Sequence, residues 1–122
     1  MNRLWIFILA LCSAVVSFSA SAQTYPQRPI RLVIGLAAGG PSDVMARSVA
    51  QVLGERLGQQ VVVDNKPGVG GNIAADLVAK SAPDGYTLFF TSTGPLGVSP
   101  SLFSKLPYDP VKDFAPVGLV AN

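Results

Sequence analysis

A doubly wound α/β fold built on a parallel sheet is predicted by three observations. Short runs of branched and apolar residues recur at 30–34, 61–63 and 86–91, as expected for strands buried in a parallel sheet. Segments with a helical apolar period separate these runs. A loop rich in glycine and small polar residues follows each strand. Because such crossovers are right-handed, the loops that follow the strands are expected at one edge of the sheet, where ligands bind in folds of this class.

The first predicted helix begins after the loop that follows residues 30–34. Ser42 is expected to cap this helix, and Asp43 lies in its first turn, where a carboxylate interacts favourably with the helix dipole. Arg47 and Arg56 are expected on the side that faces solvent. The residues that recur at a helical period are expected to form the buried face: Met45, Val49, Leu53 and Leu57.

The second predicted helix begins at Asn72, with Ile73 and Leu77 on its apolar side. Further along the chain, a short helix is expected around residues 100–104. A turn-rich connector follows, and the apolar run at 115–120 is a candidate fourth strand.

The first 22 residues have the pattern of a signal peptide. Arg3 supplies a positive charge, residues 4–16 form an apolar run, and residues 20–22 are small, so cleavage is expected before Gln23. Serines interrupt the apolar run, which leaves it short of the roughly 20 apolar residues that a membrane span needs. The sequence therefore predicts an exported protein whose residues 1–22 are removed.

The segment from residue 23 onward contains neither cysteine nor histidine, since the chain has no histidine and its only cysteine is Cys12. Disulfides, thiolate nucleophiles and histidine-dependent triads are thereby excluded, and neither a metal site nor a cofactor is expected. No pair of carboxylates is placed for acid–base catalysis, so the sequence predicts no enzyme. The formal net charge is only +2 and charged residues are scattered singly, so no nucleic-acid partner is expected.

The three loops after the strands share a chemistry suited to binding an anion. Their glycines allow backbone N–H groups to approach a ligand closely, and the first two loops lie at the positive ends of helices. Hydroxyl groups after the third strand add further donors. The residues predicted on this basis to hold a carboxylate are Gly39, Gly40, Ser42, Gly70, Gly71, Asn72, Ser92 and Thr93.

Simpler roles remain open for these residues. Any one glycine loop can be a tight strand-to-helix connection that binds nothing. Asp43 can serve only to stabilise its helix, Asn72 is a helix cap before it is a ligand contact, and Lys66 fits a solvated loop.

A nucleotide-binding enzyme is the rival interpretation, since glycine loops that open helices also cradle phosphates. A Walker-type loop needs a Gly-Lys pair, and the sequence contains none. A dinucleotide fingerprint counted from Gly68 and Gly70 places Ile73 where the third glycine belongs. The spacing therefore argues against both kinds of phosphate site.

Several motifs occur together, in order, across the segment that follows the leader: Ala38-Gly39-Gly40 with Asp43, Asp64-Asn65-Lys66-Pro67-Gly68, Gly70-Gly71-Asn72-Ile73-Ala74 and Pro83-Asp84-Gly85-Tyr86-Thr87. In this combination the chain resembles the Bug (Bordetella uptake gene) family, the substrate-binding proteins of tripartite tricarboxylate transporters. The resemblance implies a two-lobed periplasmic receptor, monomeric at full length, that delivers a small organic acid to membrane permease subunits. It implies the ligand contacts proposed above and adds Ala38 and Asp43 to them.

Members of that family are longer than this chain. By the resemblance, residues 23–122 are the N-terminal portion of lobe one of a protein with a periplasmic-binding-protein type II-like fold, without its second lobe. A role as ligand-presenting partner of a membrane sensor, and a truncated remnant that binds nothing, are the alternatives that the sequence leaves open.

Overall fold

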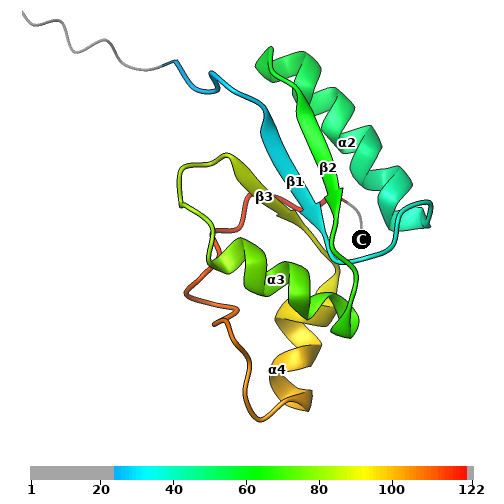
Figure 1. The fold of residues 1–122 in the computed structure, drawn as a ribbon, viewed down its shortest axis with the longest axis vertical. Helices are drawn as coiled ribbons and strands as arrows, with labels where there is room; N and C mark the ends of the chain where they lie inside the picture. The colour runs from blue at the N-terminus through cyan, green and yellow to red at the C-terminus, as the bar shows by residue number, and fades with distance from the viewer. Residues whose placement is uncertain (1–23, 121–122) are drawn as a thin grey trace, which may run out of the picture.

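The computed structural model describes residues 24–120, so the predicted signal peptide lies outside the described residues. The strands β1 (Ile30–Ile34), β2 (Val61–Asn65) and β3 (Thr87–Phe90) form one parallel sheet in the order β2-β1-β3. Helix α2 (Pro41–Leu57) connects β1 to β2, and α3 (Asn72–Ala79) connects β2 to β3. Figure 1 shows α2 and α3 on different sides of the strands. The predicted α/β fold with a parallel sheet is confirmed.

The central strand β1 carries the core on both faces of the sheet. Leu32 and Ile34 point toward α2, where they pack with Ala46 and Ala50. The partly buried apolar residues of the outer strands that join them are Val61, Val63, Leu88 and Phe90. Since side chains alternate along a strand, Val33 points to the opposite face, and it is fully buried there. Burying a large aliphatic side chain of this kind stabilises the fold by roughly 1.5–3 kcal/mol.

The buried face of α2 differs from the predicted one. Met45 is 41% exposed and Leu57 36% exposed, whereas Ala46 and Ala50 are buried. The helix therefore packs on the sheet through small side chains, and the larger apolar residues lie beside this contact. The helical period fits the predicted row with Met45 and Leu57 as well as the observed row with Ala46 and Ala50. It depends only on the spacing of apolar residues along the sequence and does not show how closely the helix approaches the sheet. The same holds for α3, where Ala74 and Ala75 are buried and Ile73 is half exposed.

Helical structure after β3 is more extensive than the sequence suggested. A π-helical turn, η2 (Gly94–Val98), leads directly into α4 (Ser99–Leu102), so the helix expected around residues 100–104 begins earlier and is part of a longer segment. None of the helices in the described part of the chain has the length and apolar character needed to cross a bilayer.

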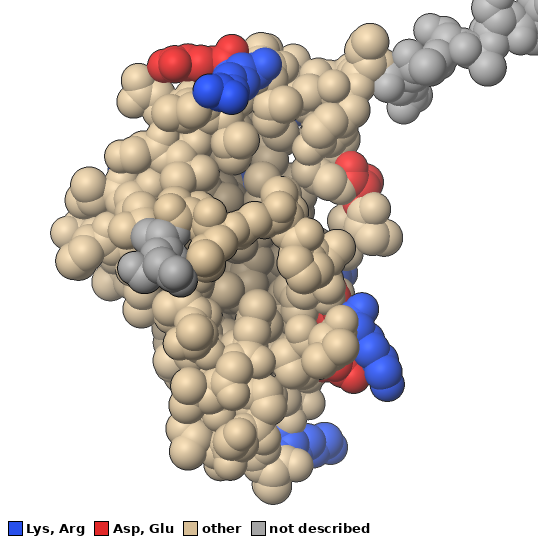
Figure 2. All heavy atoms as spheres, turned by 180° about the vertical axis from the view of Figure 1, so that it is seen from behind, with Lys and Arg blue, Asp and Glu red and all other residues tan. Residues whose placement is uncertain are grey.

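The predicted fourth strand at 115–120 is wrong. Within residues 24–120 this segment pairs with no strand, and Val117 and Leu119 are 89% and 79% exposed. A strand needs a hydrogen-bonded neighbour, and Pro116 removes one donor from the run. The connector before it is anchored, because Phe114 stacks on Phe89 of β3 with ring centroids 5.8 Å apart. Seen from behind, the molecule carries its charged side chains at the margins of a largely uncharged face (Figure 2).

Because α2 contacts the sheet through alanines, substitutions at adjacent positions of the helix should differ sharply in their effect on the free energy of unfolding. In the full-length protein, Ala46→Leu should lower the free energy of unfolding by about 1–3 kcal/mol, because it overfills a closed contact. Met45→Leu, one residue away and exposed, is the control and should change it by less than about 0.5 kcal/mol. Urea denaturation measures both values, and equal effects at the two positions would contradict the packing described here.

Candidate functional site

The loops that follow the three strands converge at the carboxyl edge of the sheet. A Cβ atom on Gly35, the first residue after β1, would lie 2.6 Å from the Cα of Gly71, which follows β2. A Cβ atom on Gly71 would lie 2.8 Å from Cγ of Pro95, which follows β3. Position 35 requires glycine because the Gly71 backbone approaches it so closely, whereas at position 71 a side chain would meet the Pro95 ring and would have to adopt a φ of 94°. Gly35 was not among the predicted site residues, although its place directly after a buried strand was a usable signal.

The first loop leads into α2 without the predicted serine cap. The N-cap is Gly40, Pro41 occupies the first helical position, and Ser42 makes no capping hydrogen bond. Proline is favoured at this position because its missing N–H is not needed in the first turn. Ala38 and Gly39 are exposed, so backbone and the Ser42 hydroxyl are what this loop can present to a ligand.

Asp43, in contrast, turns inward and is only 3% exposed. Its Oδ2 accepts hydrogen bonds from the Gly39 N–H and from Nε of Arg47, both at 2.9 Å, and its Oδ1 accepts one from Nδ2 of Asn65 at 3.0 Å. The hydrogen bond from Arg47 is the largest of the effects that lower the pKa of Asp43 to about 2, followed by those from Gly39 and Asn65. Asp43 is therefore ionised at neutral pH, and its carboxylate holds the loop together.

Arg47 lies on the solvent side of the helix, as expected. Its side chain is 55% exposed, but it pairs with Asp43 one helical turn earlier. The ion pair raises the pKa of Arg47 and gives the buried carboxylate a counter-charge.

The second loop turns in the left-handed region. Gly68, Val69, Gly70 and Gly71 all have positive φ, with values of 137°, 47°, 64° and 94°. For Val69 this is unusual, since a branched side chain in this region costs about 1–2 kcal/mol. The N–H of Gly71 donates to the Gly68 carbonyl at 2.9 Å, which closes the turn η1 (Val69–Gly71). Two glycines of the predicted site thus lie in a rigid turn.

Asn72 is not the helix cap, because Gly71 occupies that position. Its side chain is buried, and its Oδ1 accepts hydrogen bonds from the Ser99 hydroxyl at 2.8 Å and from the Tyr108 hydroxyl at 2.9 Å. Tyr108 also lies 2.7 Å from the Pro95 carbonyl, and burial raises its pKa, so the phenol keeps its proton. Asn72 therefore joins the start of α3 to α4 and the connector beyond it.

The third loop is shorter than predicted. Ser92 and Thr93 are exposed after β3, as a ligand contact requires, but the helical segment begins at Gly94 and takes up the rest of the expected loop. Gly94 lies against the second loop, since a Cβ atom on it would be 3.5 Å from the Gly70 carbonyl oxygen. The ends of the second and third loops are thus in contact.

Lys66 was expected in a solvated loop, and it instead pairs with Asp64 at 3.3 Å. Arg31 of β1 donates to the same carboxylate through Nε at 2.7 Å. Burial raises the pKa of Asp64, but the hydrogen bonds from Arg31 and Lys66 outweigh it, and the net shift is downward. This cluster links the two strands and leaves Lys66 engaged within the chain.

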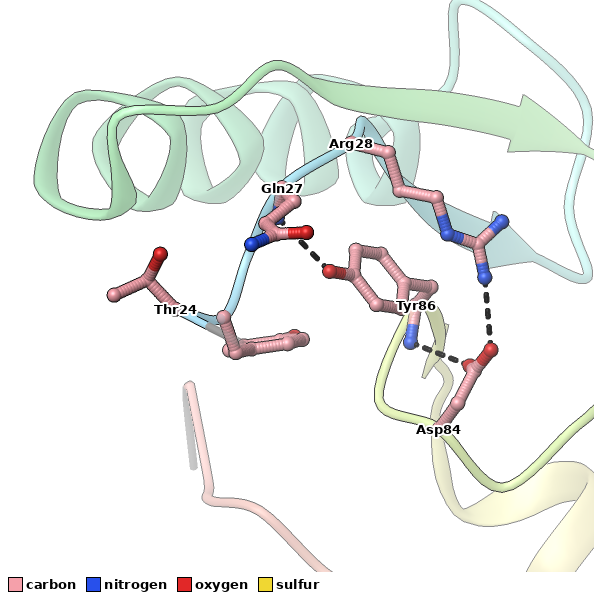
Figure 3. A pocket seen from close by; sticks show the side chains of 6 residues that line it. Thr24, Gln27, Arg28, Asp84 and Tyr86 are labelled. Atoms are coloured by element: carbon pink, nitrogen blue, oxygen red, sulfur yellow. Dashed lines mark hydrogen bonds and ion pairs between the residues drawn. The ribbon is translucent and has the colours of Figure 1, made fainter. Parts of the chain in front are cut away.

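A separate hollow lies at the other end of the strands (Figure 3). Arg28 lies over the Tyr86 ring, 4.1 Å from its centroid, and pairs with Asp84 at 2.8 Å. The Tyr86 hydroxyl accepts a hydrogen bond from the Gln27 N–H at 2.9 Å. None of the predicted site residues lines this hollow. The contacts fasten the segment before β1 to the turn before β3.

The fold and its converging loops define an α/β domain with a candidate binding edge, and comparison with known proteins places it in a family. The TctC family, described as tripartite tricarboxylate transporter family receptor, matches residues 45–122, and the chain belongs to it. It is 44% identical to the protein BugT of Bordetella pertussis over the whole chain, which corresponds to 38% of BugT. The chain thus spans little more than a third of that relative, and the resemblance to Bug proteins is confirmed.

Solved structures that share the fold include the proteins BugD and MatC. The periplasmic binding protein BugD is 44% identical with a TM-score of 0.73, over 77% of this chain and 31% of BugD. MatC from Rhodopseudomonas palustris, solved with bound malate, is 43% identical with a TM-score of 0.72, over 76% of this chain and 32% of MatC.

The bonds to Asp43 predict a specific pH dependence of stability. Because its folded pKa of about 2 lies below the ordinary value near 4, the ionised carboxylate stabilises the fold above pH 4, and this contribution is lost as the pH falls toward 2. Asp43→Asn should therefore be less stable than the wild type at pH 7, and the difference should shrink between pH 4 and pH 2. Urea denaturation across this range measures it. A difference that stays constant down to pH 2 would contradict the assignment.

Proposed function

We propose that this chain is the N-terminal portion of lobe one of a two-lobed periplasmic solute-binding protein that captures a small carboxylate for a tripartite tricarboxylate transporter. The observation that carries the proposal is the convergence of three glycine-containing loops at the carboxyl edge of the sheet, in a chain of the TctC family. That MatC was solved with malate supports a small dicarboxylate as ligand.

The first loop offers the best half-site for the ligand carboxylate. It lies at the start of α2, a helix of 17 residues, where the helix dipole favours negative charge. The Gly39 N–H already donates to Asp43, so we assign the ligand contacts of this loop to the backbone of Ala38 and Gly40 and to the Ser42 hydroxyl. Ser92 and Thr93 supply hydroxyls from the third loop.

An anion can bind here only if the charge of Asp43 is offset. Arg47 provides that offset at 2.9 Å, and the positive end of the helix adds to it. Gly70, Gly71 and Asn72 are proposed to shape the site, since the Gly71 N–H and the Asn72 Oδ1 already have partners within the chain and Gly70 lies in the turn that the Gly71 N–H closes.

The remaining parts of the proposal concern the whole protein. Residues 1–22 act as a signal peptide cleaved before Gln23, the mature protein works as a monomer in the periplasm, and it delivers its ligand to membrane permease subunits. It uses no cofactor, binds no nucleic acid and catalyses no reaction. Exposed apolar side chains late in the chain, among them Leu102 at 72% and Val111 at 83%, support further protein packing against this segment.

Titration of the full-length protein tests the proposal. Isothermal calorimetry with malate and a panel of dicarboxylic, tricarboxylic and aromatic acids should give saturable binding of at least one of them. If none binds, the proposed function is wrong.

Ser42 allows a sharper test with a matched control on the same helix. Ser42→Ala should weaken binding roughly tenfold, because it removes a hydrogen bond to a charged group, and it should leave the melting temperature unchanged since Ser42 caps nothing. Ser48→Ala removes a hydroxyl that bonds only the Val44 carbonyl and should bind like the wild type. Equal affinities for the two variants would remove Ser42 from the site.

A further inference from the structure

Asn65, at the carboxyl end of β2, contacts the first loop, a contact that its local sequence pattern does not indicate. Its Nδ2 donates to the carbonyl of Leu36 at 3.1 Å and to Oδ1 of Asp43 at 3.0 Å. Its Oδ1 accepts a bond from Nη2 of Arg47 at 3.4 Å. The orientation of the amide is thereby fixed, with donors facing acceptors on both sides. One side chain joins the end of β2, the residues after β1 and the first two turns of α2.

We propose that Asn65 is the positioning residue of the first ligand loop. The loop is held at both ends by its amide group, at Leu36 directly and at Gly39 through Asp43, whose Oδ2 accepts the Gly39 N–H. Residues 37 and 38 lie between these two points and are exposed. The inference rests on the proposed function for the claim that this loop binds a carboxylate, but the positioning itself can be tested without ligand.

The side chain suits this task because it is neutral. An amide donates two N–H bonds without adding charge next to the buried Asp43, which is already paired with Arg47. A carboxylate at position 65 would face Asp43 with the same sign of charge, and a lysine would compete with Arg47 for it. The neighbouring charged residues along the chain, Asp64 and Lys66, pair with each other.

Asn65→Leu, which keeps the size but removes both donors, tests the positioning. In the ligand-free full-length protein, hydrogen exchange at the Gly39 amide should accelerate at least about tenfold, because Asp43 loses the bond that orients it. Malate affinity should fall by about tenfold or more, while the melting temperature drops only slightly. Gln51→Leu, the same change at an amide that bonds only Glu55 on the helix surface, is the control and should alter neither quantity.

Asn65→Asp tests the positioning role through the pH dependence of malate affinity, which should not change if Asn65 only stabilises the fold. At pH 7.5 its carboxylate repels Asp43, and malate affinity should fall as in Asn65→Leu. Near pH 5 the pair of carboxylates should share a proton, whose O–H replaces the N–H bond to Asp43 but not the one to Leu36, so affinity relative to the wild type at the same pH should recover in part.

The outcomes separate this inference from the proposed function. Unchanged Gly39 exchange in Asn65→Leu overturns the positioning role whether or not malate binds. Faster exchange with wild-type malate affinity overturns the link to the ligand site. If the wild type binds no acid, the proposed function fails, and the exchange measurement still decides whether Asn65 positions the loop.

Discussion

The backbone of Gly71 lies so close to Gly35 that Gly35 can carry no side chain, and this contact sets the spacing of the loops at the edge of the sheet. Gly71 in turn contacts Pro95, so the residues after all three strands are held in one row. Parallel strands bring their carboxyl ends together in any fold of this class. Here the missing side chains reduce the distance between the loops to direct backbone contact.

Electrostatics acts on the same edge through Asp43. A buried carboxylate is costly unless hydrogen bonds and a counter-charge replace water, and Asp43 has three hydrogen bonds, one of them from the positively charged Arg47. Its charge is used to hold the polypeptide. The ligand in the proposed function therefore meets backbone, hydroxyl groups and the helix terminus, with the acidic group behind them already neutralised.

The sequence predicted the sheet, its helices and the edge at which the loops meet, because these follow from short apolar runs and from glycines directly after them. It did not predict which residues of α2 are buried. Ala46 and Met45 are neighbours, and only the distance between helix and sheet decides which one fits. The apolar run at 115–120 failed as a strand for a related reason, since pairing depends on a partner and not on local pattern.

At the site, the residue types were predicted better than their roles. Ser42 and Asn72 were expected to cap helices, and glycines occupy both cap positions instead. The side chain of Asn72 instead reaches Ser99 and Tyr108, which are 27 and 36 residues further along the chain. Asn65 escaped notice because its three partners lie in the loop after β1 and in α2, both distant from it in the sequence, and no local pattern indicates such contacts.

The left-handed turn at 68–71 has a consequence for the energetics of capture. The bond from Gly71 to Gly68 closes this turn, and its packing against Gly35 and Pro95 holds it in place. A binding loop that is ordered beforehand loses little conformational entropy when its ligand arrives. In the proposed function, the strain at Val69 is a cost of folding that is met once when the chain acquires its structure, and binding and release then take place beside a preorganised turn.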